Sequence, residues 1–191
     1  MAITINGSGT IGGVSVGGLP DGIVDTDMLA SAAVTSAKVG SLGTSNLPAG
    51  SVLQVVQSSY ATTVQITTST YTSTGLTASI TPSSSSNKIL VLANVNVYYG
   101  SQNNIVFGMR INRSGSYPWT NYYFNNVGSV VNLMNPYGIN YLDSPSTTSS
   151  TTYTIEFNTT SGASIYSYPN AQLAPGGNQS QSTMTLMEIA G

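Results

Sequence analysis

The side chains of this sequence that suit acid–base or metal chemistry are its six carboxylates. They are Asp21, Asp25, Asp27, Asp143, Glu156 and Glu188. A glycoside hydrolase needs two carboxyl groups that face each other across a cleft. Glu156 instead falls on the polar face of an alternating strand pattern, and Glu188 lies three residues before Gly191, so we interpret both as solvent-exposed strand charges. The spacing of the three N-terminal aspartates, DGIVDTD, does not match a calcium-binding loop, and we assign these residues to turns and caps.

The residue types that are absent exclude further classes of chemistry. The chain has no His and no Cys, which leaves no ligands for a typical zinc or iron–sulfur site and no His base for a nucleophilic triad. We therefore expect no cofactor, no metal and no enzymatic activity. Four Lys and Arg residues are too few for a nucleic-acid-binding surface. The longest aliphatic run, residues 89–93, is far shorter than a membrane span, so we expect no membrane insertion.

The densest aromatic segment, SGSYPWTNYYFNN, is a candidate binding surface. Its aromatic residues include Tyr117, Trp119, Tyr122 and Tyr123. Exposed rings beside Asn side chains would form a platform on which a host-surface polysaccharide stacks. Burial in the protein core or at a subunit interface explains the same residues without a ligand. The sequence leaves both explanations open.

The composition favours a folded protein with an unusual surface. Ser, Thr, Asn and Gly make up 90 of the 191 residues, whereas charged residues make up 5%. About 25% of a typical soluble domain is charged. Hydroxyl and amide groups must therefore cover most of the surface of this protein.

The composition changes near residue 50. Residues 1–50 contain ten Gly and no aromatic residue, so they have little with which to build a core. We interpret this segment as an extended N-terminal arm that becomes ordered against a partner. Residues 26–39 predict either a short helix or a fibre-like repeat, and the sequence does not decide between the two. The apolar residues expected to dock the arm on a virion are Ile3, Ile5, Ile11, Val14, Val16 and Leu19.

Residues 51–191 alternate apolar and polar positions with a period of two, which is typical of β-strands. The stretch KILVLANVNVYY places Ile89 and every second residue after it on one face, and Leu90 and Leu92 on the other. We predict that this strand begins with both faces buried. Turn residues separate the segments, and the whole predicts an all-β, antiparallel β-sandwich resembling a jelly roll. The predicted strands cover residues 52–60, 62–68, 76–80, 88–99, 105–111, 117–124, 127–134, 153–157, 164–168 and 182–189.

Four stretches resemble a β-domain that recurs in tailed bacteriophages. They are LPAGSVLQVVQ, STGLTASITPSSSSNKILVLANVNV, YLDSPSTTSSTTYTIEF and STMTLMEIAG. This domain is similar to the distal domain of phage tail fibres and tailspikes and to trimeric capsid cement (decoration) proteins, including those of cyanophages. The first 40 residues likewise resemble the attachment segments of such proteins.

The resemblance implies a homotrimer on a virion. We expect a capsid decoration protein on the outer capsid surface, because a short arm followed by a β-domain is more typical of such a protein than of a long tail fibre. Its expected partners are other copies of itself, the major capsid protein and a host-surface polysaccharide. The alternative is a tail-fibre or tailspike tip that binds a host-surface glycan.

Overall fold

The computed structural model describes residues 4–5, 11–12, 43, 46–99, 105–125, 133–159, 165–167 and 181–191. The chain divides into two units, Met1–Gly43 and Thr44–Gly191. In the first unit, β1 (Thr4–Ile5) pairs with β2 (Ile11–Gly12) in antiparallel register. The predicted helix or repeat at 26–39 lies outside the described residues. No helix among the described residues has the length and apolar character needed to span a membrane.

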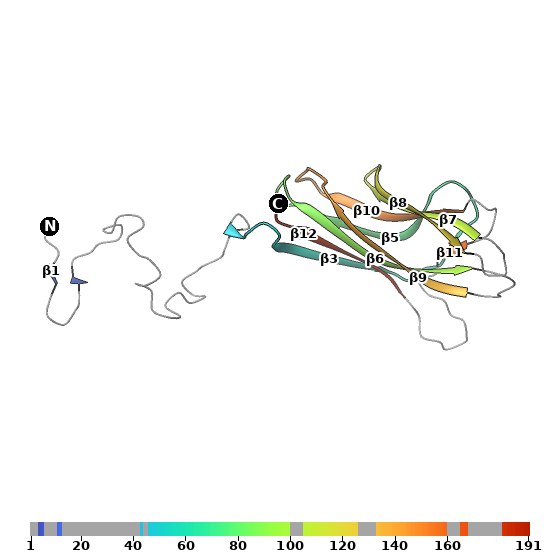
Figure 1. Ribbon diagram of the computed structural model, residues 1–191, viewed down its shortest axis with the longest axis horizontal. Helices are drawn as coiled ribbons and strands as arrows, with labels where there is room; N and C mark the ends of the chain where they lie inside the picture. Colours follow the sequence, from blue (N-terminus) through green and yellow to red (C-terminus); the bar gives the residue numbers. More distant parts are fainter. Residues whose placement is uncertain are drawn as a thin grey trace. The chain divides into compact units, whose positions relative to one another are not determined.

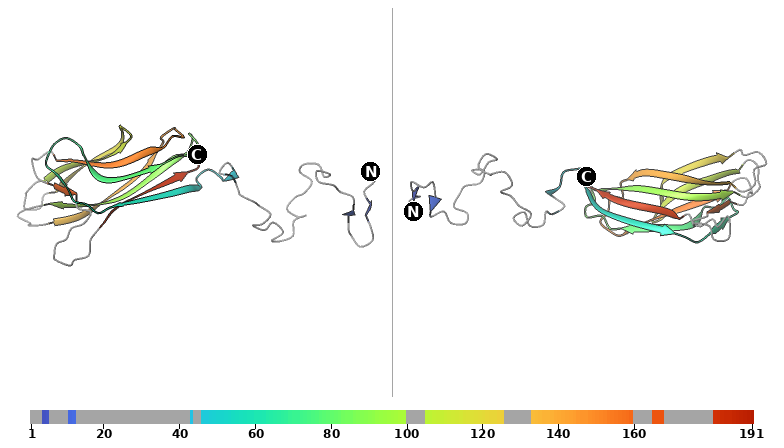
Figure 2. Two further views of the ribbon diagram at one scale, coloured as in Figure 1. Left: turned by 180° about the vertical axis from the view of Figure 1, so that it is seen from behind. Right: turned by 90° about the horizontal axis from the view of Figure 1, so that it is seen from below.

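The second unit is an antiparallel β-sandwich, as the sequence predicted (Figure 1). Figure 2 shows the same two layers of strands from behind and from below. The strands are β3 (Val52–Tyr60), β4 (Val64–Ile66), β5 (Thr72–Ile80), β6 (Lys88–Tyr99), β7 (Ile105–Arg113), β8 (Ser116–Asn125), β9 (Leu133–Asp143), β10 (Thr151–Thr159), β11 (Ile165–Ser167) and β12 (Ser182–Ile189).

The strand order is that of a jelly roll. The smaller sheet has the order β5-β10-β7-β8. In the larger sheet, β6 pairs with β9 on one side and with β12 and then β11 on the other, while β3 and β4 pair with β12 and β11. We number the positions along the chain, with β3 and β4 together as position 1, β5 to β10 as positions 2 to 7, and β11 and β12 together as position 8. The larger sheet then has the order 1-8-3-6, and the smaller sheet has the order 2-7-4-5. The pairs 1–8, 2–7, 3–6 and 4–5 are nested, as in a long hairpin folded over on itself, which is the two-Greek-key arrangement of a jelly roll.

Alternation along the strands builds the core between the sheets. Every second residue of β6 from Ile89 to Val97 is buried, and Phe107, Tyr153 and Phe157 are fully buried opposite them. The predicted inward face of this strand is therefore confirmed.

One strand of the larger sheet was not predicted. The predicted strand at 127–134 reaches β9 only at its last two residues, because β9 covers Leu133–Asp143 and residues 127–132 lie outside the described part of the chain. Pro136 and Gly138 lie inside β9, and both residue types are depleted in strands. In the described structure β9 pairs only with β6, and such an edge position tolerates a proline.

The outer face of the larger sheet carries an apolar row. Val55, Met187, Leu90 and Leu142 are direct neighbours across β3, β12, β6 and β9. Val55 is 55% exposed and Leu142 is 48% exposed, while the two between them are half-buried. The prediction that β6 begins with both faces buried is therefore wrong for the single chain, because no described segment of the chain covers Leu90.

The outer face of the smaller sheet is held by hydroxyl groups. The side-chain oxygens of Thr77 and Thr154 are 3.1 Å apart, and those of Ser79 and Thr152 are 2.8 Å apart. Both are directly opposed cross-strand pairs between β5 and β10. At these positions, uncharged hydrogen bonds link β5 to β10.

Glu188 is buried at one end of the sandwich, so the interpretation of this residue as a solvent-exposed charge is wrong. Its carboxylate accepts hydrogen bonds from the Ser83 amide (2.6 Å) and hydroxyl (2.8 Å), from Asn87 Nδ2 (2.6 Å) and from Gln54 Nε2 (2.6 Å). Burial alone would raise the pKa of Glu188. The hydrogen bonds from Asn87, Gln54 and Ser83 outweigh burial and hold this pKa below its ordinary value of 4.5.

Glu188→Gln should therefore destabilise the protein at neutral pH. The new amide places donors against the donors of the site, and we expect a loss of about 1–3 kcal/mol in the free energy of unfolding, measured by urea denaturation at pH 7. Thr183→Val, an outward position on the same strand, is the control and should change this value by less than about 0.5 kcal/mol.

The same pair of proteins tests the direction of the pKa shift. Because folding lowers the pKa of Glu188, its stabilising contribution is complete above pH 4.5 and is lost as the pH falls through the folded-state value. Melting temperatures between pH 3 and 7 should fall less steeply in acid for Glu188→Gln than for the unmodified protein. Equal slopes would contradict this account of the network.

Candidate functional site

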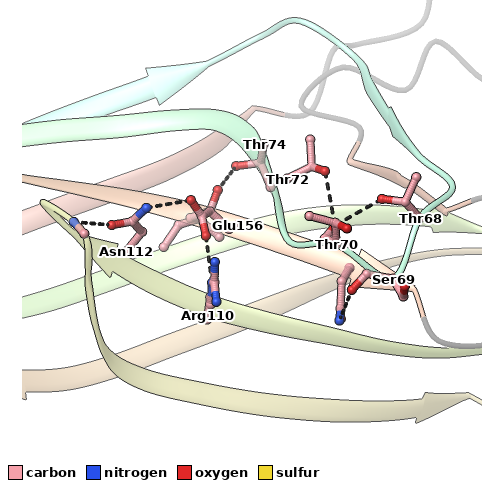
Figure 3. Close-up of polar contacts among 11 residues, drawn as sticks. Thr68, Ser69, Thr70, Thr72, Thr74, Arg110, Asn112 and Glu156 are labelled. Carbon is pink, nitrogen blue, oxygen red and sulfur yellow. Dashed lines mark hydrogen bonds and ion pairs between the residues drawn. The ribbon is translucent and has the colours of Figure 1, made fainter.

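A cluster of aromatic and polar side chains surrounds Arg110 on the outer face of the smaller sheet. Arg110 on β7 donates from Nε to Glu156 Oε2 on β10 at 2.7 Å. Asn112 Nδ2 donates to the other carboxylate oxygen, Oε1, at 2.7 Å, and Asn112 Oδ1 accepts from the Gly115 amide at 2.8 Å (Figure 3). Glu156 is 9% exposed, so the interpretation of this residue as a solvent-exposed charge is also wrong.

Two tyrosine rings enclose the guanidinium of Arg110. Its carbon lies 4.0 Å from the ring centroid of Tyr71 and 3.6 Å from that of Tyr117. Cation–π contacts of this kind contribute about 0.5–2 kcal/mol, depending on their exposure. With Glu156 as its ionic partner, the side chain of Arg110 is fixed on three sides.

Tyr71 reaches across the sheet because residue 108 is a glycine. A Cβ at position 108 would collide with the Tyr71 hydroxyl and with Asn158 Oδ1. The Tyr71 hydroxyl is buried there and has no partner at hydrogen-bonding geometry in the described structure. Burial, followed by the neighbouring Tyr122 hydroxyl, raises the pKa of Tyr71 well above its ordinary value.

The segment that carries Tyr71 is held by short hydrogen bonds, most of them shown in Figure 3. The hydroxyls of Thr68 and Thr72 both donate to the Thr70 carbonyl, at 3.1 and 3.2 Å. Asn158 Nδ2 donates to the Ser69 carbonyl at 3.0 Å. The two threonine bonds hold the segment internally, and the Asn158 bond attaches it to β10 next to the tyrosine that covers Arg110.

The structure divides the four aromatic residues that the sequence singled out. Tyr117 and Tyr122 are exposed, at 50% and 58%, and Tyr117 covers Arg110 on the outer face. Trp119 and Tyr123 pack against the core, where the Tyr123 ring stacks on Phe107 with centroids 5.1 Å apart. Alternation along β8 separates Tyr122 from Trp119 and Tyr123, because a strand directs successive side chains to opposite faces. Tyr117 would share the face of Trp119 by strict alternation, but the β7–β8 register shifts between Ile111 and Arg113, and Tyr117 lies on the outer face beyond this irregularity. Exposure at the surface and burial in the core thus apply to different residues of this segment.

Sequence reasoning did not connect Tyr71, Arg110 and Glu156. Arg110 and Glu156 are opposed across the β7–β10 pairing but lie 46 residues apart in the chain. The sequence signal for Arg110 was its rarity, since the chain has four Lys and Arg residues in all. Nothing in the local pattern indicated which carboxylate would pair with it.

The N-terminal candidates are described only in part. Ile5 belongs to β1 and Ile11 to β2, and these two residues are directly paired. The remaining predicted docking residues lie outside the described part of the chain. They are Ile3, Val14, Val16 and Leu19.

The carboxylates of the sandwich do not form a common centre. Asp143 accepts both hydrogen bonds from Arg113 Nη1 (2.8 Å each) and one from the Tyr153 hydroxyl (2.7 Å), inside the protein. Glu188 faces the core of the larger sheet, whereas Glu156 lies on the outer face of the smaller one. Among the described residues, no group of three His, Cys, Asp or Glu side chains is placed to hold a metal ion.

A pocket of about 270 Å³ lies beside the Glu188 network. Its lining includes Leu47, Leu53, Ser83, Asn87 and Ala190. The Glu188 carboxylate already accepts four hydrogen bonds from protein groups, so it does not serve as a binding group for a ligand in this pocket.

Comparison with known proteins gives likeness in structure alone. No protein-family model matches the chain. No curated protein matches it either. Solved structures that resemble it include the VP2 subviral particle of infectious bursal disease virus (14% identity, TM-score 0.44) and T=1 particles derived from that virus (15% identity, TM-score 0.39).

Each match covers 72% of this chain but only 33% and 36% of those proteins. At such TM-scores the likeness does not decide the function of this chain. Its function therefore has to be inferred from the surfaces and side chains of this chain.

Gly108→Ala tests the packing of the Arg110 cluster. The added methyl group must displace Tyr71 or Asn158, and we expect a loss of about 1–3 kcal/mol in the free energy of unfolding. Gly138→Ala is the matched control, because a Cβ at this strand glycine would meet no atom within 4 Å. The control should leave the stability unchanged or raise it by up to about 1 kcal/mol. Equal effects of the two substitutions in urea denaturation would show that Tyr71 does not pack on Gly108.

Proposed function

We propose that this protein is a structural component of a phage virion, a decoration protein on the outer capsid surface. The observation that carries the proposal is the apolar row of Val55, Met187, Leu90 and Leu142 on the outer face of a jelly roll. Exposed contiguous apolar surface on a soluble protein marks an interaction site. The sequence of β6 has the pattern of a strand buried on both faces, and assembly supplies the second cover.

The charge distribution suits contact between copies. Lys88 is the one charged residue among the positions paired across this face in the described strands. The formal net charge of the whole chain is −2, so that copies repel each other weakly. Covering the row would add about 1.5–3 kcal/mol for each large apolar side chain taken fully out of water. We assign this face to contacts between copies, and the resemblance to phage proteins gives three as their number.

Leu142→Asp should break the association. A carboxylate in the middle of an apolar contact loses its hydration without gaining a partner. Asn140→Asp is the control, because residue 140 is an exposed position on the same face of β9, opposite Leu92 rather than Leu90. Light scattering at micromolar concentration should give a trimer for the unmodified protein and for Asn140→Asp, and about 20 kDa for Leu142→Asp. A 20 kDa mass for the unmodified protein would contradict the assignment.

The N-terminal arm is the proposed attachment to the major capsid protein. Its apolar residues alternate with Gly and small polar residues, and extended segments of this kind bind by adding a strand to a neighbouring sheet. The described core residues of the sandwich all belong to the second unit, so we assign attachment to the first.

Deletion of residues 1–20 should leave a β-rich protein with a cooperative melt that no longer joins particles. Circular dichroism checks the fold, and quantitative mass spectrometry of purified virions checks incorporation. Normal occupancy of the truncated protein would place attachment in the sandwich. The copy number of the full-length protein separates the two locations, since hundreds of copies per virion indicate the capsid and a few dozen or fewer indicate a tail tip.

A further inference from the structure

Three exposed aromatic rings lie on one strand of the smaller sheet. Tyr117, Tyr122 and Phe124 of β8 are 50%, 58% and 65% exposed. Among the described residues, every other exposed large hydrophobic side chain is aliphatic and lies on the larger sheet. Tyr122 and Phe124 are two positions apart, so their rings point to the same face about 7 Å from each other. The two rings therefore follow one another along the axis of β8.

Hydrogen-bonding groups lie next to these rings. Arg110 is opposed to Thr120 in the β7–β8 register, between the positions of Tyr117 and Tyr122 on β8. Its Nε is bound to Glu156, but its two terminal nitrogens make no hydrogen bond within the described part of the chain. The Glu156 oxygens each accept one hydrogen bond and retain further acceptor capacity. Ring faces beside such donors and acceptors match the alternating C–H and O–H surfaces of a sugar.

The charges at this site cancel. Arg110 and Glu156 form an ion pair with 19% and 12% of their side chains exposed. The other outward positions of β5, β7, β8 and β10 in this region are Thr, Ser, Asn, Gly, Val or aromatic residues. A sulfated or phosphorylated ligand would find no net positive charge here. The complementary ligand is neutral and rich in hydroxyl groups.

The polar groups are held in place before any ligand arrives. Tyr71 and Tyr117 enclose the guanidinium, and Asn112 holds the carboxylate from the other side. Side chains that are already fixed lose little conformational entropy on binding.

We propose that the outer face of the smaller sheet binds a neutral polysaccharide, with sugar rings stacked on Tyr117, Tyr122 and Phe124 and hydroxyl groups bonded to Arg110 and Glu156. The site lies on the opposite side of the sandwich from the apolar row. It therefore does not depend on the proposed attachment to the capsid, and the failure of one proposal leaves the other intact.

Titration calorimetry of the full-length protein against four neutral polymers, laminarin, dextran, mannan and galactan, tests the proposal. Heparin and polygalacturonate are the charged comparisons. We expect at least one neutral polymer to bind and both charged polymers to bind more weakly. The absence of binding to all four neutral polymers, or tighter binding to a charged one, would overturn the proposal.

Substitutions then locate the site. Tyr122→Ala and Phe124→Ala should each lower the affinity about fivefold to a hundredfold, which corresponds to about 1–3 kcal/mol. Val52→Ala removes an exposed apolar side chain from the larger sheet, at a position outside the apolar row, and is the matched control. Both rings are more than half exposed, so the variants should melt within a few degrees of the unmodified protein. Unchanged affinity in both aromatic variants, or an equal loss in Val52→Ala, would show that the polymer binds elsewhere.

Discussion

The backbone of β6 provides hydrogen-bonding partners for three other strands of the larger sheet. Its twelve residues pair with β9 along one side and with β12 and then β11 along the other. Because β3 and β4 follow on β12 and β11, the position of every strand in this sheet depends on β6. The same strand places Ile89, Val91, Val95 and Val97 in the core and leaves Leu90 outside. The apolar row on the outer face of the larger sheet therefore depends on the register of β6 with β12 and β9.

The carboxylates of the sandwich are bound to arginines or to neutral donors. Asp143, Glu156 and Glu188 are 2%, 9% and 1% exposed, and each accepts at least two hydrogen bonds. Arg113 is the cationic partner of Asp143, and Arg110 is that of Glu156. If the strands paired in another register, a buried carboxylate would lose its partner and remain as an uncompensated charge. These contacts therefore favour one arrangement of the strands.

Local patterns predicted much of this fold because most of its strands alternate strictly. The predicted boundaries of β3 and β12 agree with the structure, since 52–60 and 182–189 contain no strand-breaking residue. Most of β9 was not predicted, because Pro136 and Gly138 interrupt the run of strand-forming residues. An edge strand tolerates such residues because one of its sides is not paired. Tyr117 and Tyr122 of the binding face were identified by their aromatic density. Arg110, Glu156 and Tyr71 were not, because their contacts depend on strand register over long sequence distances, which one sequence does not reveal.

The hydroxyl pairs on the smaller sheet have a consequence for the solvent in which the protein works. Attraction between exposed ions is screened over about 10 Å at 0.1 M salt and about 3 Å at 1 M. The bonds between Thr77 and Thr154 and between Ser79 and Thr152 join neutral groups, so dissolved ions have no charge to screen there. The contacts between β5 and β10 at these positions are therefore the same in dilute buffer and in brine.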